Sequence, residues 1–257
     1  MRRWLLSPML RHRLQEAALP AARKTLVRGP PDFCHGLLVL VAVLVLGAPG
    51  LGAAQVGDSL TIARLQYGGG GDWYANPSSL PNLLAAVRER TGIVTARREA
   101  DVEPLDPSLS DFPYLYMTGH GEVRFTPQER AALRTYLTSG GFLHADDNYG
   151  LDESFRREVA ALFPDAELTE IPPDHPVFRA YYEFPDGLPK IHEHDGAPPQ
   201  ALGIFHGGRL VVFYSFESDL GDGWEDPDVH GDPAEVREEA LRMGVNLFVY
   251  VLGQEAS

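Results

Sequence analysis

Residues 140–150 read GGFLHADDNYG and place a short apolar strand between the end of one helix and the start of another. The paired glycines are typical of a helix end, and Phe142–Ala145 predicts the strand. In α/β folds such a strand-turn-helix corner commonly displays a nucleophile. This corner instead displays Asp146, Asp147 and Asn148, so it offers carboxylates and an amide but no Ser or Cys.

Strand and helix patterns alternate on both sides of this corner. The predicted strands are Thr61–Tyr67, Ile93–Arg97, Phe112–Met117, Phe142–Ala145, Glu167–Ile171, Ala201–Phe205 and Arg209–Phe216. The predicted helices are Ser79–Arg90, Thr126 to Gly140, Asp152–Phe163 and Asp232 to Leu252, the second opened by a capping box. This alternation predicts an α/β fold with a mainly parallel sheet and helices on both faces. A hairpin at Gly207-Gly208 adds an antiparallel strand at one side.

The first 54 residues differ in composition from the rest of the chain. They hold seven basic and two acidic residues, and an uncharged run follows from Gly36 to Gly57. Its apolar centre, Leu37–Leu46, is about half the length of a bilayer-spanning helix. The pattern predicts a secretory signal peptide cleaved near Ala54, with an uncleaved membrane anchor as the alternative. We therefore expect an exported protein of the periplasm or cell envelope, with residues 55–257 as one domain.

Residues 55–257 carry 15 Lys and Arg against 34 Asp and Glu, a net charge of −19. This excess argues against nucleic acid or an anionic membrane surface as a partner, and leaves the N-terminal segment as the only contact with a membrane. Metal cations and neutral or cationic ligands suit it better, although acidity also keeps an exported protein soluble. The single cysteine, Cys34, precedes the apolar run, so the predicted domain has no thiol.

Four loops place unusual residues at the carboxyl ends of predicted strands, where ligands bind in such folds. Turn chemistry explains their glycines and aspartates but not their aromatic and histidine residues. Four aromatic rings, those of Trp73, Tyr74, Tyr149 and Trp224, can stack on a sugar or on another ring, although two of them could merely cover the end of the sheet. The ligand-binding candidates are Asp72, Trp73, Tyr74, Asp146, Asn148, Tyr149, Asp219, Asp222 and Trp224.

Acid–base chemistry has its own candidates in His120, Asp147, His192 and Glu217. His120 lies between two glycines after an apolar strand, which favours a side chain that faces the crevice. His144 is expected to be a packed core residue. His175 and His206 lie beside Pro and Gly turns and are expected to be structural. His230 is a second-rank candidate for the site.

The richest titratable cluster is KIHEHDG, residues 190–196. If this segment is extended, His192 and His194 share a face, and with Asp195 they predict a divalent metal site. The alternatives are a loop whose histidines bind backbone carbonyls, and a general base paired with a carboxylate. No nucleotide cofactor is expected, because the glycines at 68–71 lack the Lys-Ser/Thr of a phosphate loop and the spacing of a dinucleotide fingerprint. They are expected to let the backbone approach the rim.

Several motifs together resemble the DUF4159 family of uncharacterised bacterial proteins, from Leu60 to Leu252. They are YGGGGDWY, MTGHGEV, GGFLHADDNYG, PPDHPVF, GLPKIHEHDG and FESDLGDGWED. The resemblance implies a flavodoxin-like three-layer fold of the class I glutamine amidotransferase-like type, as in ThuA-like proteins, and export or a membrane link. It implies no activity, because glutamine amidotransferases display a Cys at the corner where this chain has aspartates.

Two functions from different classes follow from these residues. The first is an envelope module that lacks the Cys nucleophile and binds a small molecule, a glycan or an envelope protein. The alternative is a hydrolase or lyase that acts on a carbohydrate or cell-envelope substrate through His and Asp/Glu, with or without a metal. Convergence of His120, Asp147, His192, His194 and Glu217 around one cavity would favour the enzyme. A large distance from His192 and His194 to the Asp146–Asn148 turn would argue against it.

Overall fold

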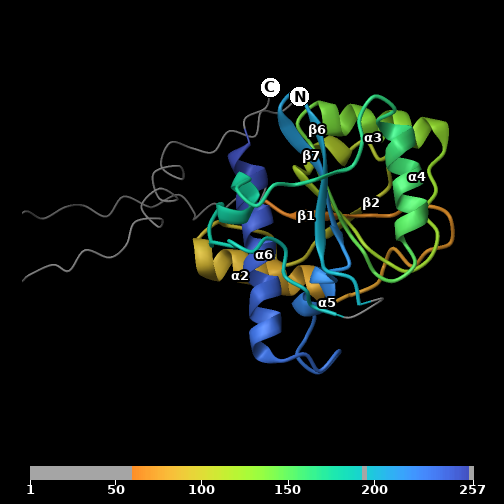
Figure 1. Ribbon diagram of the computed structural model, residues 1–257. Coiled ribbons are helices and arrows are strands. Elements are labelled where there is room, and N and C mark those ends of the chain that lie inside the picture. The colour runs from red at the N-terminus through yellow and green to blue at the C-terminus, as the bar shows by residue number, and fades with distance from the viewer. Residues whose placement is uncertain (1–59, 193–195, 255–257) are drawn as a thin grey trace, which may run out of the picture.

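The computed structural model of the protein describes residues 60–192 and 196–254. A single sheet runs through the middle, with helices packed on both faces (Figure 1). The predicted signal segment, residues 1–54, lies outside the described residues. Among the helices in the described ranges, none is long and apolar enough to cross a membrane.

The sheet has the order β2-β1-β3-β4-β7-β6-β5. Its strands are β1 (Ile62–Leu65), β2 (Ala100–Val102), β3 (Tyr114–Met117), β4 (Phe142–Asp146), β5 (Thr169–Glu170), β6 (Gln200–His206) and β7 (Arg209–Phe216). Five neighbouring strands are parallel: β2, β1, β3, β4 and β7. The sheet continues beyond β7 with β6 and β5, which pair antiparallel. This arrangement confirms the predicted α/β class and is consistent with a flavodoxin-like fold, in which ligands bind where the strand order reverses, between β1 and β3.

Two pairs of longer helices cover the two faces of the sheet (Figure 1). Helices α2 (Ser79–Thr91) and α6 (Ala234–Gly253) pack on one face, and α3 (Pro127–Thr138) and α4 (Asp152–Leu162) on the other. The short helix α5 (Leu220–Trp224) follows β7 and packs against α2 and α6. The predicted capping box at the start of α3 is present, with Thr126 and Glu129 bonding each other's backbone N–H.

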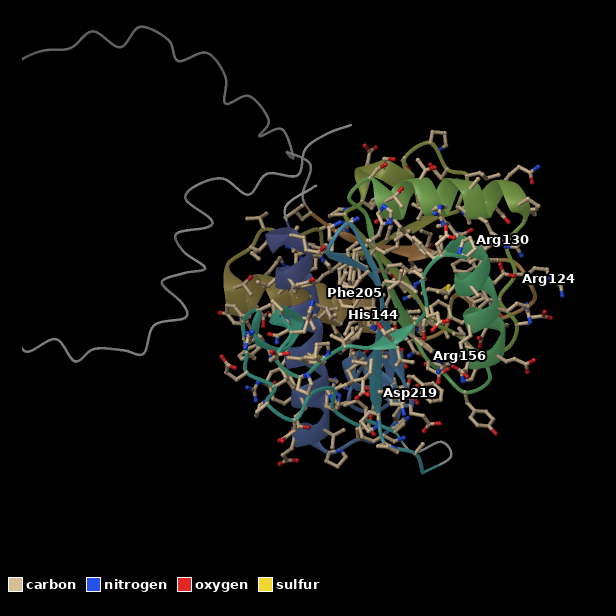
Figure 2. All side chains as sticks on the ribbon, turned by 45° about the horizontal axis from the view of Figure 1, so that its top comes forward. Arg124, Arg130, His144, Arg156, Phe205 and Asp219 are labelled. Atoms are coloured by element: carbon tan, nitrogen blue, oxygen red, sulfur yellow. The ribbon has the colours of Figure 1, made fainter. Side chains whose placement is uncertain are left out.

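The central strands are buried on both faces, as their continuous apolar runs predict. His144 lies in this interior and is fully buried (Figure 2). Its Nδ1 lies 3.0 Å from the Tyr114 hydroxyl and its Nε2 lies 2.8 Å from the Ser215 hydroxyl. Burial lowers the pKa of His144 to about 3, so the ring is neutral. The prediction of a packed core histidine is confirmed.

Three predicted elements need correction. Within the predicted strand Ile93–Arg97, only Thr95 forms a bridge, to Leu60 just before β1, and the guanidinium of Arg88 binds the Ala96 carbonyl. The strand that pairs with β1 at this edge is β2 instead. Between the predicted strand Arg209–Phe216 and the predicted helix from Asp232, where no element is predicted, the structure has α5. The last helix is preceded by Pro233 rather than capped by Asp232, whose carboxylate turns to His192.

Candidate functional site

The loops that follow β1 and β3 pair with each other at the strand-order reversal. The N–H groups of Gly71 and Asp72 donate to the carbonyls of Glu122 and His120, both at 3.2 Å. A Cβ atom at Gly69 would clash with the Glu122 carbonyl. The glycines therefore allow close approach of two backbones, as expected from the sequence.

Aromatic and polar side chains lie on the outside of these paired loops. His120 Nδ1 lies 3.1 Å from Asp72 Oδ2, and Trp73 packs edge-on against Tyr74 with ring centroids 5.6 Å apart. The β4 loop adjoins them, because a Cβ at Gly150 would lie 3.8 Å from the N–H of Gly121. Tyr74 is 63% exposed and Tyr149 is 60% exposed. We call Asp72, Trp73, Tyr74, His120 and Tyr149 the aromatic face.

The carboxylate of Asp146, at the end of β4, is fully buried. It accepts hydrogen bonds from the Ser215 hydroxyl at 2.5 Å, the Leu220 N–H at 3.2 Å, the Gly221 N–H at 2.6 Å and the Tyr116 hydroxyl at 3.2 Å. Burial raises its pKa to about 6. The prediction that Asp146 contacts a ligand is therefore corrected: its oxygens hold the first turn of α5 in place.

Asp147 and Asp219 are buried carboxyl groups beside Asp146. One oxygen of Asp147 accepts from the Glu217 N–H at 3.5 Å, and Oδ1 is buried without a hydrogen-bond partner among the described residues. Burial, together with the charge of Asp152, raises the pKa of Asp147 to about 7. Burial and the charge of Asp146 raise the pKa of Asp219 to about 10, so Asp219 is protonated at neutral pH.

Backbone strain concentrates at the same edge of the sheet. Asn76, Glu217 and Asp219 have φ angles of +57°, +58° and +57°, and they are the non-glycine residues with positive φ within 60–192 and 196–254. Such conformations cost free energy and persist where the surroundings impose them, often at functional sites. Arg64 imposes the turn at Asn76 by donating to the carbonyls of Ala75 and Asn76.

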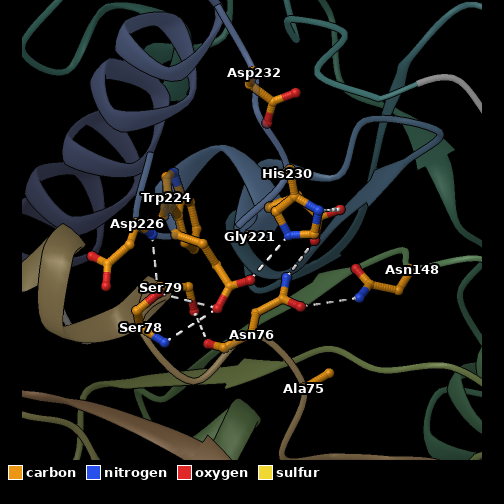
Figure 3. Close-up of polar contacts among 12 residues, drawn as sticks. Ala75, Asn76, Ser78, Ser79, Asn148, Gly221, Trp224, Asp226, His230 and Asp232 are labelled. Carbon is orange, nitrogen blue, oxygen red and sulfur yellow. Dashed lines mark hydrogen bonds and ion pairs between the residues drawn. The ribbon is translucent and has the colours of Figure 1, made fainter. Parts of the chain in front are cut away.

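A chain of side-chain hydrogen bonds runs from Thr118, directly after β3, to Asp222 in α5. Its link between Asn148 and Asn76 is drawn in Figure 3. The Thr118 hydroxyl donates to Asn148 at 3.1 Å, Asn148 donates to Asn76 at 3.5 Å, and Asn76 donates to Asp222 Oδ1 at 2.6 Å. Asn148 is buried in this chain, so its predicted ligand contact is corrected to a structural link that fixes Asp222.

At the end of this chain, two imidazoles meet carboxylates. His192 Nδ1 lies 2.8 Å from Asp222 Oδ2, and His230 Nδ1 lies 3.7 Å from the same oxygen. On their other sides, His192 Nε2 lies 2.8 Å from Asp232 and His230 Nε2 lies 3.0 Å from Glu225. We call His192, Asp222, Glu225, His230 and Asp232 the histidine cluster. Figure 3 shows His230 and Asp232 on the loop that leads into α6.

The segment before β6 carries seven prolines from Pro172 to Pro199, and this proline-rich segment delivers His192 to the cluster. The N–H groups of Ile191 and His192 donate to the Ser218 carbonyl at 3.0 and 3.4 Å. Next to it, Lys190 pairs with Glu217 at 2.8 Å, and both side chains are largely buried. The Glu217 carboxylate therefore pairs with the charge of Lys190 and fixes the Lys190 side chain.

The predicted acid–base residues form separate groups. Asp147 and Glu217 lie together, His192 joins the histidine cluster, and His120 pairs with Asp72 on the surface. Trp224 is fully buried and donates from Nε1 to the Ala240 carbonyl, so its predicted contact with ligand is wrong. Of the predicted metal ligands, His194 and Asp195 lie outside the described residues.

Sequence reasoning missed three residues of this edge. Asn76 and Glu225 are not among the residues predicted for the site, and Asp232 is predicted only as the start of the last helix. The signal was the run from Asp222 to Asp232, DGWEDPDVHGD, which sets a histidine among several carboxylates.

A family model described as "Domain of unknown function (DUF4159)" matches residues 61–252, a span that holds every residue of the aromatic face and the histidine cluster. Among curated proteins, none matches the chain.

Proposed function

The chain belongs to the DUF4159 family, and we propose that it is an exported binding module of the cell envelope whose ligand is a glycan held on the aromatic face. The observation that carries this proposal is the pair of exposed tyrosines, Tyr74 and Tyr149, beside the polar pair of His120 and Asp72. They stand on the loops of β1, β3 and β4, at the place where flavodoxin-like sheets bind ligands.

The chemistry of this surface favours a neutral sugar over an anionic ligand. Flat rings stack on the apolar face of a sugar ring, while the imidazole and carboxylate can bond its hydroxyl groups. The net charge of residues 55–257, −19, repels anions. The basic N-terminus and its short apolar run support export.

A screen of neutral oligosaccharides against the full chain, read by thermal shift and then by calorimetry, tests the proposal. We expect Tyr74→Ala and Tyr149→Ala each to weaken binding of the best oligosaccharide about tenfold, the effect of losing about 1.4 kcal/mol of stacking. Phe205→Ala is the matched control, because Phe205 is a 37% exposed aromatic beside the β6–β7 turn, at the opposite end of the sheet. Equal affinity in both tyrosine variants would contradict the proposal.

A second candidate function is hydrolysis or elimination on a carbohydrate or cell-envelope substrate, and Asp147 is the observation that favours it. A buried carboxyl with a pKa of about 7 and an unpaired oxygen among the described atoms can hold or release a proton at neutral pH. The test is product release from the same oligosaccharides. Asp147→Asn should abolish release and leave binding intact; product formed at the wild-type rate would exclude this role.

A further inference from the structure

We propose that His192, His230 and Asp222 bind a divalent first-row transition metal ion, of which Zn²⁺ suits the donors best. This site goes beyond the proposed glycan binding and does not depend on it, because the aromatic face and the histidine cluster share no residue. The three ligand atoms come from three separate segments: the proline-rich segment, α5, and the loop before α6.

The spacing of the ligand atoms matches a tetrahedral metal site. One nitrogen from each imidazole and one oxygen of Asp222 all lie within 4.8 Å of one another. Ligand atoms about 2.0–2.2 Å from a tetrahedral zinc lie roughly 3.3–3.6 Å apart. The distances from Asp222 Oδ2 to the two Nδ1 atoms, 2.8 and 3.7 Å, fall on either side of this value, so small side-chain rotations bring all three into range.

Each proposed ligand is held from behind by a hydrogen bond on its other polar atom. Asp232 lies 2.8 Å from His192 Nε2, Glu225 lies 3.0 Å from His230 Nε2, and Asn76 donates to Asp222 Oδ1 at 2.6 Å. A neutral imidazole that donates from Nε2 carries its lone pair on Nδ1, and both Nδ1 atoms face Asp222. Such carboxylate–histidine pairs orient the ligands in known metal sites and raise their basicity.

The histidine cluster contains more carboxylates than imidazoles. Three carboxylates surround the two imidazoles, so the cluster has a charge of −3 when both rings are neutral. The two rings lie close together, with centroids 5.0 Å apart, and a divalent ion between their Nδ1 atoms would offset two of these negative charges.

The donor set also selects the class of metal. Two imidazoles and one carboxylate suit Zn²⁺ and its first-row neighbours, whereas Ca²⁺ and Mg²⁺ prefer sets made of oxygen. The side chains of His192 and His230 are 28% and 27% exposed, so a bound ion is reached from solvent. Asp232 and Glu225, which hold the rings, are themselves buried, and Asp232 Oδ2 has no hydrogen-bond partner among the residues described.

The test uses the full chain without a polyhistidine tag, stripped with a chelator and titrated with Co²⁺ and then Zn²⁺. We expect one equivalent of Co²⁺ to give a visible d–d spectrum that Zn²⁺ abolishes. Asp222→Asn keeps an oxygen for Asn76 but replaces the ligand oxygen with an amide, and His230→Gln removes one imidazole. Each should weaken Zn²⁺ binding at least about 100-fold, while Asp232→Asn and Glu225→Gln should weaken it about 10- to 100-fold.

His206→Gln is the matched control, because His206 is an exposed histidine on β6 outside the cluster, and it should bind Zn²⁺ like the wild type. Tyr74→Ala should also keep wild-type metal affinity, which separates this site from the proposed glycan site. Far-UV circular dichroism of the stripped proteins shows whether each variant is folded. A wild-type protein that binds no Co²⁺ or Zn²⁺, or folded Asp222→Asn and His230→Gln proteins with wild-type affinity, would overturn the proposal.

Discussion

At the scale of single residues, Asp147 shows how burial sets the chemistry of this edge. Its carboxyl group lies between the charges of Asp146 and Asp152 and is shielded from water. Deprotonation therefore places a charge where water cannot solvate it, and the pKa rises from 3.8 to about 7. A group whose pKa is raised on folding binds its proton more tightly in the native state. Its contribution to stability is thus lost as the pH rises from about 4 to about 7.

Replacing Asp147 with Asn mimics the protonated acid and removes this pH dependence. We expect Asp147→Asn to be more stable than the wild type by about 1–3 kcal/mol at pH 8 and to differ little at pH 4. Urea denaturation at the two pH values measures both differences. Asp101→Asn, the same change at an exposed position of β2, should show neither. An Asp147→Asn gain that is equal at both pH values would contradict the buried-acid explanation.

At the scale of elements, the paired loops after β1 and β3 depend on a glycine where two backbones meet. Gly69 and Gly70 both have positive φ, +108° and +95°, but only the Cβ position of Gly69 meets other atoms, those of Glu122 and Arg124. We expect Gly69→Ala to lower the free energy of unfolding by about 2–4 kcal/mol and Gly70→Ala by about 1 kcal/mol. Chemical denaturation measures both losses of unfolding free energy. Their difference is the cost of the contact between a Cβ at position 69 and the backbone of Glu122 and Arg124. Equal losses would show that backbone conformation alone requires the glycines.

Helix α5 depends on Asp146, whose carboxylate accepts hydrogen bonds from two N–H groups of its first turn. Asn at this position would turn an NH₂ group toward the N–H and O–H donors that now bond to the carboxylate. We expect Asp146→Asn to destabilise the protein by about 2–4 kcal/mol at pH 8, measured by urea denaturation. The exposed Asp101→Asn serves again as the comparison. A variant as stable as the wild type would mean that α5 is positioned by its other contacts.

Local sequence patterns predicted most of the helices and strands around these loops. The capping box before α3, the Gly-Gly turn between β6 and β7 and the buried run of β3 are signals carried by adjacent residues. The signal failed where a distant side chain decided the structure. Arg88 of α2 binds the Ala96 carbonyl in a predicted strand, and Asp232 pairs with His192 forty residues away instead of capping α6.

At the scale of the molecule, strand order predicted which loops lie together better than residue types predicted which side chains are exposed. Parallel strands bring their carboxyl ends to one edge, so His120, Asp147, Asp222 and Tyr149 were assigned to the same rim from order alone. Which of them face outward could not be read from the sequence, because burial depends on the packing of α5. Asp146, Asn148 and Trp224 are consequently inside, and Asp72, Tyr74 and His120 outside.

Export of the whole molecule is a separate prediction carried by the N-terminal residues. We expect protein purified from the cell envelope to begin near Gln55, directly after the small residues that end the apolar run. N-terminal sequencing of the native protein measures this. An intact Met1 on a cytoplasmic protein would contradict both cleavage and export.

We propose that the carboxyl edge of the sheet is the functional end of the molecule. The most direct measurement is NMR mapping of the isotope-labelled full chain with the oligosaccharide that gives the largest thermal shift. We predict that the perturbed backbone amides fall in the loops at residues 68–76, 118–122 and 147–150. Perturbations gathered instead at the opposite end of the sheet, around His206 and the glycines at 207 and 208, would contradict the claim, as would a panel in which no oligosaccharide binds.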